Sequence, residues 1–330
     1  MQIRSALLGE RPGHAYLFAG PDGVGKYLAA AQVAALLLCE APADGGQDAC
    51  GQCTSCRQTE RDSHPDLHIV EAEEGKRFIA LEQIHGLREQ YSLRPHGDKR
   101  IAILRDADRM TMEAANSLLK TLEEPPPWGL LILTTSRPTG LPETIFSRCQ
   151  TLRFGPLSRE DATRALQERL GWEPRAAQFA AALSDGSIGQ ALELHKLGGA
   201  ELGDFLADRL QRITRQNNFE LAAETLERTS DLGKTLESQR NGLRLVLRVI
   251  LRHYRDVLGV KLGLPEERVF NVSRMDALRA MAERLPQPIV EDAIEATLDA
   301  WGKVNRNVNL TLLLENYFFV LGDLMQRAGQ

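Results

Sequence analysis

The chain has 330 residues, of which 43% are hydrophobic and 26% are charged, as in a protein of two or three packed domains. Its formal net charge of −5 argues against a protein that coats nucleic acid through its overall charge, although a local basic surface remains open. The longest apolar stretch, around residues 28–39, is too short to cross a bilayer, and no signal peptide is visible. We therefore expect a cytoplasmic protein without a membrane partner.

Short apolar segments alternate with helical patterns in the first half of the chain. The predicted strands are Tyr16–Ala19, Leu67–Val70, Ile101–Leu104, Leu130–Thr134 and Thr151–Phe154. The clearest helical pattern runs from Ala114 to Leu122 and is ended by Pro125. Near-continuous apolar strands of this kind suit a parallel sheet that is buried on both faces, so a doubly wound α/β domain is predicted.

A glycine-rich segment follows the first predicted strand and precedes an Ala- and Leu-rich helix, which is the setting of a phosphate-binding P-loop. Gly20, Gly23 and Gly25 would let backbone N–H groups face phosphate oxygens. Lys26 stands where a P-loop lysine reaches the outer phosphates. The next position should carry the Ser or Thr hydroxyl that holds Mg²⁺, but it carries Tyr27. These residues are the candidate nucleotide site, and it is defective at its metal position.

Four of the five cysteines, Cys39, Cys50, Cys53 and Cys56, lie close together after this helix. In a reducing compartment such clustering indicates a metal rather than disulfides, and four thiolates close a structural zinc shell. The alternatives are free cysteines on a flexible insertion, with redox catalysis a weaker third. His64 is close enough to substitute as a ligand, but it is more simply a turn residue before a proline.

After the fifth predicted strand, the sequence pattern becomes that of helices. Ser158, with Asp161 three residues later, reads as the start of a helix. A small helical domain is expected to end near Gly198, with a break around residues 184–187. Beyond it the chain is helical almost throughout, and its last helix has apolar residues at helical spacing from Leu310 to Leu324.

The end of the third predicted strand carries the second half of the nucleotide site, and here the chain resembles the AAA+ proteins and, within them, the clamp-loader family. That family places Asp-Glu-Ala-His or a variant after four apolar residues. Aligned on Ala107, this chain has Arg105 at the metal-binding Asp and Asp106 at the Glu. A guanidinium repels Mg²⁺. A one-residue slip would make Asp106 the ligand, but the favoured reading of Asp106 and Asp108 is helix-start carboxylates.

Further segments match bacterial clamp-loader subunits, and together they cover nearly the whole chain. They are the run from Asn116 to Pro126, the first-sensor region Leu133–Ser136, the four-cysteine insertion, Ser147-Arg148-Cys149, the second-sensor region from Asp185 to Leu192, and Asn305 to Asn309, which resembles the start of the last collar helix. In this family the arginine of the Ser-Arg-Cys motif reaches a neighbouring subunit's ATP site. Without that match Arg148 would read as a helix-capping surface residue. The family's ATPases carry Arg where this chain has Gly189.

The resemblance implies three parts: an AAA+ P-loop-type core over residues 1–155 with a zinc module at 39–56, a helical lid over 156–199, and a helical collar for oligomerisation over 200–330. It implies a non-hydrolysing, stator-like subunit of the bacterial DNA polymerase III clamp loader, within a DNA-directed DNA polymerase holoenzyme. Its cofactor would be structural zinc, with ATP not bound productively, and Arg148 would act in trans as an arginine finger.

The implied partners are the delta and tau/gamma subunits of a hetero-pentamer, and through that complex the sliding clamp and primed DNA. One alternative is an active AAA+ ATPase, either a clamp-loader motor subunit or a helicase-type relative. Another is a zinc-stabilised DNA-binding protein. Five arginines also recur at helical spacing, Arg240, Arg244, Arg248, Arg252 and Arg255. A solvated or ion-paired face is favoured for them over contact with phosphate, while contact with partner subunits stays open.

Overall fold

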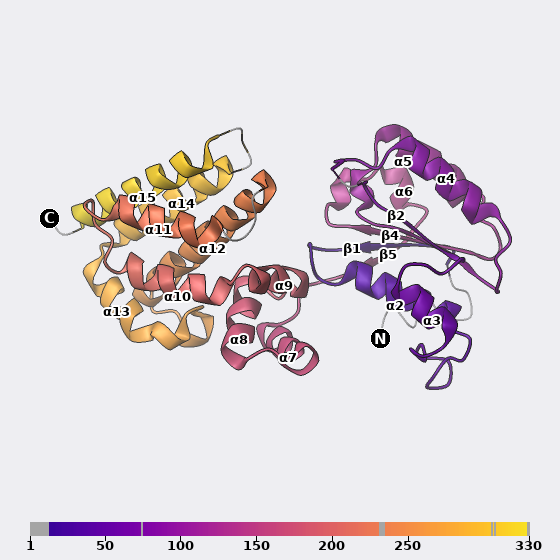
Figure 1. Ribbon diagram of the computed structural model, residues 1–330, viewed down its shortest axis with the longest axis horizontal. Coiled ribbons are helices and arrows are strands. Elements are labelled where there is room, and N and C mark those ends of the chain that lie inside the picture. The colour runs from indigo at the N-terminus through magenta and orange to yellow at the C-terminus, as the bar shows by residue number, and fades with distance from the viewer. Residues whose placement is uncertain (1–12, 74, 231–234, 305, 307, 329–330) are drawn as a thin grey trace. The chain divides into compact units, whose positions relative to one another are not determined.

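The computed structural model in Figure 1 describes residues 13–330, apart from residues 74, 231–234, 305, 307 and 329–330. The chain divides into two compact units, Met1–Pro156 and Leu157–Gln330. The first unit is α/β and the second is helical, as the sequence predicts. Among the described residues, no helix combines the length and the apolar character that a membrane span requires.

All five predicted strands form, and each strand end lies within one residue of its predicted position. They are β1 (Ala15–Ala19), β2 (Leu67–Val70), β3 (Arg100–Leu104), β4 (Gly129–Thr135) and β5 (Gln150–Arg153). Their order in the sheet is β2-β3-β4-β1-β5, and every neighbouring pair is parallel. The P-loop strand β1 therefore lies between β4 and β5, away from both edges.

Helices cover both faces of this sheet, as expected for a doubly wound domain (Figure 1). On one face, α4 (Leu81–Ser92) and α5 (Met112–Glu123) pack against side chains that include Leu17 and Leu133. On the other face, α2 (Lys26–Leu38) packs against the alternate positions, including Phe18 and Ile132. Alternate strand residues thus enter different cores, which explains why β1, β3 and β4 are buried throughout.

Short elements complete the first unit around the ends of the sheet. They are α3 (Thr54–Glu60), the 3-10 helices η1 (Ala107–Arg109) and η2 (Pro138–Gly140), and α6 (Glu143–Phe146). The strand β5 is largely exposed, unlike the buried strand that its apolar pattern suggested. It is an edge strand, so only one of its sides pairs with a neighbour.

With the predicted start after Ser158 and the predicted break at residues 184–187, the second unit is built from helices. They are α7 (Arg159–Leu170), α8 (Pro174–Leu183), α9 (Ile188–Lys196), α10 (Gly199–Leu210), α11 (Asn218–Ser230), α12 (Leu236–Lys261), α13 (Met275–Arg284), α14 (Gln287–Lys303) and α15 (Leu310–Arg327), with η3 (Glu266–Arg268) and η4 (Val272–Arg274). Ser158 caps α7 by accepting a 3.0 Å hydrogen bond from the Asp161 backbone N–H. The last helix buries one face, which includes Tyr317 and Phe318.

Two hydrophobic clusters organise this unit. A small one joins α7, α8 and α9 around Leu166, and a larger one joins the helices from α10 onward. Leu183 of α8 and Leu194 of α9 also belong to the larger cluster. The first three helices are therefore packed onto the rest, and the division of this unit into a lid and a collar stays a prediction.

Candidate functional site

The P-loop backbone forms at the carboxyl end of β1, where ligands bind in open parallel sheets. Gly20 donates its N–H to the Thr135 carbonyl at 3.1 Å. It has no room for a side chain, because a Cβ there would lie 2.2 Å from the Phe154 carbonyl oxygen. Gly23 and Gly25 have positive φ angles, 72° and 90°, and Gly25 is the N-cap of α2. The predicted glycines thus serve a tight strand–loop–helix turn.

Lys26 turns back into its own loop. Its ammonium donates to the carbonyls of Gly20 and Pro21 at 2.8 and 2.7 Å, and the residue is only 6% exposed. Burial lowers the pKa of this ammonium, while Asp22, Asp106 and Asp108 act in the opposite direction. The lysine is therefore held by loop carbonyls and by nearby carboxylates, rather than being extended into an open phosphate site.

Two of the three departures from the nucleotide-binding pattern, Tyr27 and Arg105, contact one another, and the third is Gly189. The guanidinium carbon of Arg105 lies 4.2 Å from the centroid of the Tyr27 ring. Arg105 also pairs with Glu71 at 2.7 Å, and the Tyr27 hydroxyl donates to the carboxylate of Asp62 at 3.0 and 3.1 Å. Burial, followed by the hydrogen bond to Asp62, raises the pKa of Tyr27 to about 12, so the phenol stays protonated. A cation–π pair thus occupies the region of the two expected metal ligands.

The two aspartates after β3 begin a short helix, as their favoured reading predicts. Asp106 is the N-cap of η1, and its backbone N–H donates to the Thr134 hydroxyl at 3.0 Å. Asp108 accepts 2.7 and 3.1 Å hydrogen bonds from Thr135 and Arg137. The hydroxyls of Thr134 and Thr135, in the predicted first-sensor region, are therefore bonded to this loop.

An open pocket of about 470 Å³ adjoins the P-loop. It is lined by Asp22, Asp106, Asp108, Arg109, Ser136 and Arg137. Burial raises the pKa of Asp106, and the neighbouring carboxylates of Asp22 and Asp108 add to this effect. Arg137 is paired with Asp108, so the pocket lining combines three carboxylates with two guanidinium groups.

Arg148 follows α6 on the surface of the first unit, and its side chain is 35% exposed. It donates to the Thr144 carbonyl at 3.0 Å and to the Glu123 carboxylate at 2.6 Å. These contacts combine the helix-capping role with an ion pair at the surface. Burial raises the pKa of the adjacent Cys149 thiol to about 12, so this cysteine is not an activated nucleophile.

The predicted second-sensor region lies in the second unit, where α12 holds it. Arg252 forms an ion pair with Asp185, and Arg248 donates to the Gln190 side chain at 2.9 Å. Gly189, between these two contacts, contributes no charged side chain. Arg252 is therefore ion-paired and Arg248 is hydrogen-bonded inside their own unit, while the role of the five-arginine face as a whole stays a prediction.

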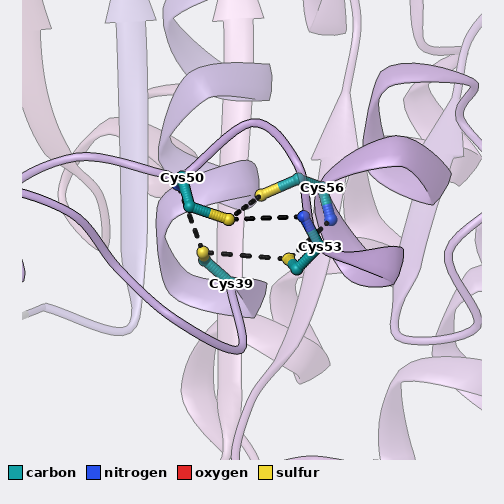
Figure 2. A group of neighbouring side chains, drawn as sticks. All are labelled: Cys39, Cys50, Cys53 and Cys56. Atoms are coloured by element: carbon teal, nitrogen blue, oxygen red, sulfur yellow. Dashed lines mark hydrogen bonds between the residues drawn. The ribbon is translucent and has the colours of Figure 1, made fainter.

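Figure 2 shows the four clustered cysteines converging from the end of α2, the following loop and the start of α3. Their sulfur atoms all lie within 4.8 Å of one another, with separations of 3.9 Å for both Cys39–Cys53 and Cys50–Cys56. Tetrahedral ligation at a Zn–S distance of about 2.3 Å requires sulfurs about 3.8 Å apart. The four residues therefore fit a tetrahedral metal ion closely.

Backbone N–H groups also prepare these sulfurs to carry negative charge. Cys53 and Cys56 each donate a backbone N–H, at 3.3 Å, to the preceding cysteine's sulfur of the C-x2-C pattern. Backbone N–H groups that donate to the Cys50 sulfur lower the pKa of this thiol to about 6, and the N–H of Gln52 has the largest effect. Burial raises the pKa of Cys56 to about 12, so a bound cation is needed to hold all four as thiolates. His64 is not among them, because its ring contacts Ser55 and the backbone of Asp66.

Sequence reasoning identified the cysteines and the departures, but it missed their connections. Nothing in the local pattern indicates that Asp62 binds Tyr27 or that His64 contacts Ser55. One signal was available for the Tyr27–Arg105 contact. Both positions ligate the same Mg²⁺ in an active P-loop protein, so whatever replaces the two ligands must meet in the same place.

Comparison with known proteins gives a consistent family. Residues 1–158 match the family model described as "DNA polymerase III, delta subunit". The chain is 32% identical to the DNA polymerase III subunit delta' of Bacillus subtilis, over 95% of this chain and 92% of that protein. It is 36% identical to the Pseudomonas aeruginosa subunit delta', over 62% of each chain.

Solved structures also resemble the chain over its length. A DNA polymerase III gamma subunit-related protein of Thermotoga maritima covers 98% of both chains at 18% identity, with a TM-score of 0.47.

Proposed function

The chain belongs to the family of bacterial DNA polymerase III delta' subunits, and on that premise we propose that it is a clamp-loader subunit that does not itself hydrolyse ATP. In this role it is a stator-like partner of the delta and tau/gamma subunits in a hetero-pentamer. The complex would load the sliding clamp onto primed DNA in the cytoplasm. Its core, lid and collar would be residues 1–155, 156–199 and 200–330.

The contact between Tyr27 and Arg105 is the observation that carries the non-hydrolysing role. In P-loop ATPases the corresponding hydroxyl and strand-end carboxylate hold Mg²⁺, which neutralises charge on the transferred phosphoryl group. Here a permanent cation and an aromatic ring take that region, and a cation repels Mg²⁺. Lys26 is bound by its own loop carbonyls, and Gly189 offers no sensing charge. Productive ATP binding is therefore not expected.

Calorimetric titration of the isolated chain with Mg²⁺–ATP tests this part of the proposal. We expect no saturable binding at micromolar ATP and no turnover above a buffer control. Micromolar binding that requires Mg²⁺, together with turnover by the isolated chain, would instead favour an active AAA+ ATPase.

Arg148 is the group through which we propose that the chain acts on ATP, in trans at a neighbouring subunit's site. Its guanidinium is partly exposed and paired with Glu123 at the surface. Exposed ion pairs contribute only about 0–1 kcal/mol, so exchanging this carboxylate for a phosphate oxygen costs little. An arginine finger contributes roughly 10³–10⁵ in turnover at the site that it enters.

We further propose one structural Zn²⁺ held by Cys39, Cys50, Cys53 and Cys56. The spacing of the sulfurs supports it, and the backbone N–H bonds to them suit thiolate ligands. Four protein ligands leave no open coordination position, so this ion would organise the loop between α2 and α3 and would not act on a substrate. Metal analysis of protein purified without chelator tests this, with one zinc per chain expected.

A further inference from the structure

A series of hydrogen bonds connects the four-cysteine module, residues 39–56, to the sheet. Ser55 lies on α3, and both its backbone N–H and its hydroxyl donate to Glu40, at 3.2 and 2.9 Å. His64 Nε2 lies 3.1 Å from the Ser55 hydroxyl oxygen. Because the Asp66 N–H donates to His64 Nδ1 at 3.0 Å, the ring proton must lie on Nε2, from which it is donated to Ser55. Burial lowers the pKa of His64, which keeps the ring neutral.

The far end of this chain is fixed in the sheet. Asp66 is 1% exposed and forms an ion pair with Arg100 of β3 at 2.9 Å. It also accepts hydrogen bonds from the backbone N–H groups of His96 and Gly97 at 2.9–3.1 Å. A carboxylate with so many partners has little freedom to move. The segment that follows α3 is therefore held at one end by the cysteine-bearing helix and at the other by the sheet.

Asp62 lies in this segment, and it contacts the P-loop helix. Its backbone has a positive φ of 52°, and its N–H donates to the Thr59 carbonyl of α3 at 3.1 Å. Its carboxylate accepts the hydrogen bond of the Tyr27 hydroxyl. The Tyr27 ring in turn contacts the guanidinium of Arg105, which also pairs with Glu71. The module and the degenerate nucleotide site are thus connected through one carboxylate.

We propose that the cysteine module positions Tyr27 through Asp62, so that metal binding by the four cysteines holds the degenerate P-loop closed. Asp62 is a positioning residue in this arrangement, and His64 fixes the segment that carries it. The inference rests on the proposed zinc site. The module would then do more than order its own loop. It would stabilise the conformation of the P-loop, as a bound Mg²⁺–nucleotide does in an active P-loop protein.

Amide hydrogen exchange of the full chain tests this coupling, with zinc bound and after its removal by a chelator. In the wild type, zinc removal should speed exchange at residues 39–60 and also at residues 20–28. At the second segment we expect about tenfold, the scale of one hydrogen bond to a charged group. Tyr27→Phe keeps the ring under Arg105 but loses the hydroxyl donor. In this variant exchange at 20–28 should already be fast with zinc bound, and zinc removal should add nothing.

A matched pair of aspartate variants provides the control. Asp62 and Asp44 both have positive φ angles, which glycine adopts without strain. Asp62→Gly should reproduce the effect of Tyr27→Phe, whereas Asp44→Gly, within the module, should leave exchange at 20–28 unchanged. If zinc removal speeds exchange at 39–60 alone, the zinc site stands and the coupling is wrong. If the protein holds no zinc and the chelator changes neither segment, the zinc site and the coupling both fail.

Discussion

The guanidinium carbon of Arg105 lies 4.2 Å from the centroid of the Tyr27 ring. The two residues come from the end of β3 and the start of α2, the two places from which a P-loop ATPase ligates Mg²⁺. Two separate departures from the motif are therefore one structural substitution, in which a protein cation and a ring take the place of a metal and its ligands. We propose that this substitution stabilises the conformation of the P-loop without a nucleotide.

A double-mutant cycle on Arg105→Ala and Tyr27→Leu should measure this contact. Because Arg105 is 37% exposed, we expect a coupling free energy of unfolding of only about 0.5–1 kcal/mol, as for exposed cation–π pairs. Chemical denaturation of the four proteins gives the value. Strictly additive single changes would mean that the contact contributes no stability.

Zinc removal should destabilise the first unit more than the second. Binding to the folded state alone stabilises by mass action, so a chelator should lower the thermal midpoint of the cysteine-bearing unit. Cys50→Ser and Cys53→Ser should each reduce bound zinc well below one per chain. Cys149→Ser is the matched control and should keep its zinc, since Cys149 packs against the hydrophobic core. Equal zinc loss in all three variants would contradict the four-cysteine assignment.

The second unit should lose stability as the pH falls from about 7 to 4, because of His253. Burial, and secondly the charge of Arg274, lowers the pKa of His253 from 6.5 to about 4. Between pH 6.5 and 4, His253 is therefore protonated in the unfolded chain but not in the folded chain. The free energy of unfolding is unaffected by this group above pH 6.5 and falls as the pH drops below it. The full loss approaches about 3 kcal/mol near pH 4.

His253→Gln should remove that part of the pH dependence. Among the described residues, Nδ1 of His253 has no hydrogen-bond partner, so the substitution breaks no bond at that atom. His85→Gln, on the exposed side of α4, is the matched control. Denaturant midpoints at several pH values should then show a flatter slope for the first variant only. Equal slopes in all three proteins would show that His253 does not titrate on unfolding.

Arg252 and Arg255 offer a comparison within one helix. Arg252 is 21% exposed and paired with Asp185, whereas Arg255 is exposed. Arg252→Ala should destabilise the second unit by about 0.5–1 kcal/mol and loosen the loop between α8 and α9, while Arg255→Ala should fall within about 0.5 kcal/mol of the wild type. Denaturation and amide exchange over residues 184–190 provide the readouts. No difference between the two variants would leave the ion pair without effect.

The sequence predicted the sheet well because its strands are short, apolar and separated by clear helical patterns. Each strand end was right to within one residue, and Ser158 was correctly identified as a helix cap. The burial of β5 was predicted wrongly, since an apolar pattern does not reveal which strand lies at the edge. The order of the strands is likewise a property of long-range packing.

The candidate site was predictable in its residues but not in its contacts. Cysteine spacing is a local signal, and the sulfurs converge as that spacing suggests. The roles of Asp62 and His64 depend on segments that meet only after folding. The hydrogen bond from Lys26 to its own loop could not be predicted either, because the motif has the same residues whether the lysine binds phosphate or the loop carbonyls.

The most direct test of the account is ATP turnover by the reconstituted clamp-loader complex carrying Arg148→Ala in this chain. Arg153→Ala, an exposed arginine on β5, is the matched control. Single-turnover assays with clamp and primed DNA should show hydrolysis at the neighbouring site falling by roughly 10³-fold or more with the first variant, and normal hydrolysis with the second. Unchanged turnover with Arg148→Ala, in a complex that still assembles, would contradict the account.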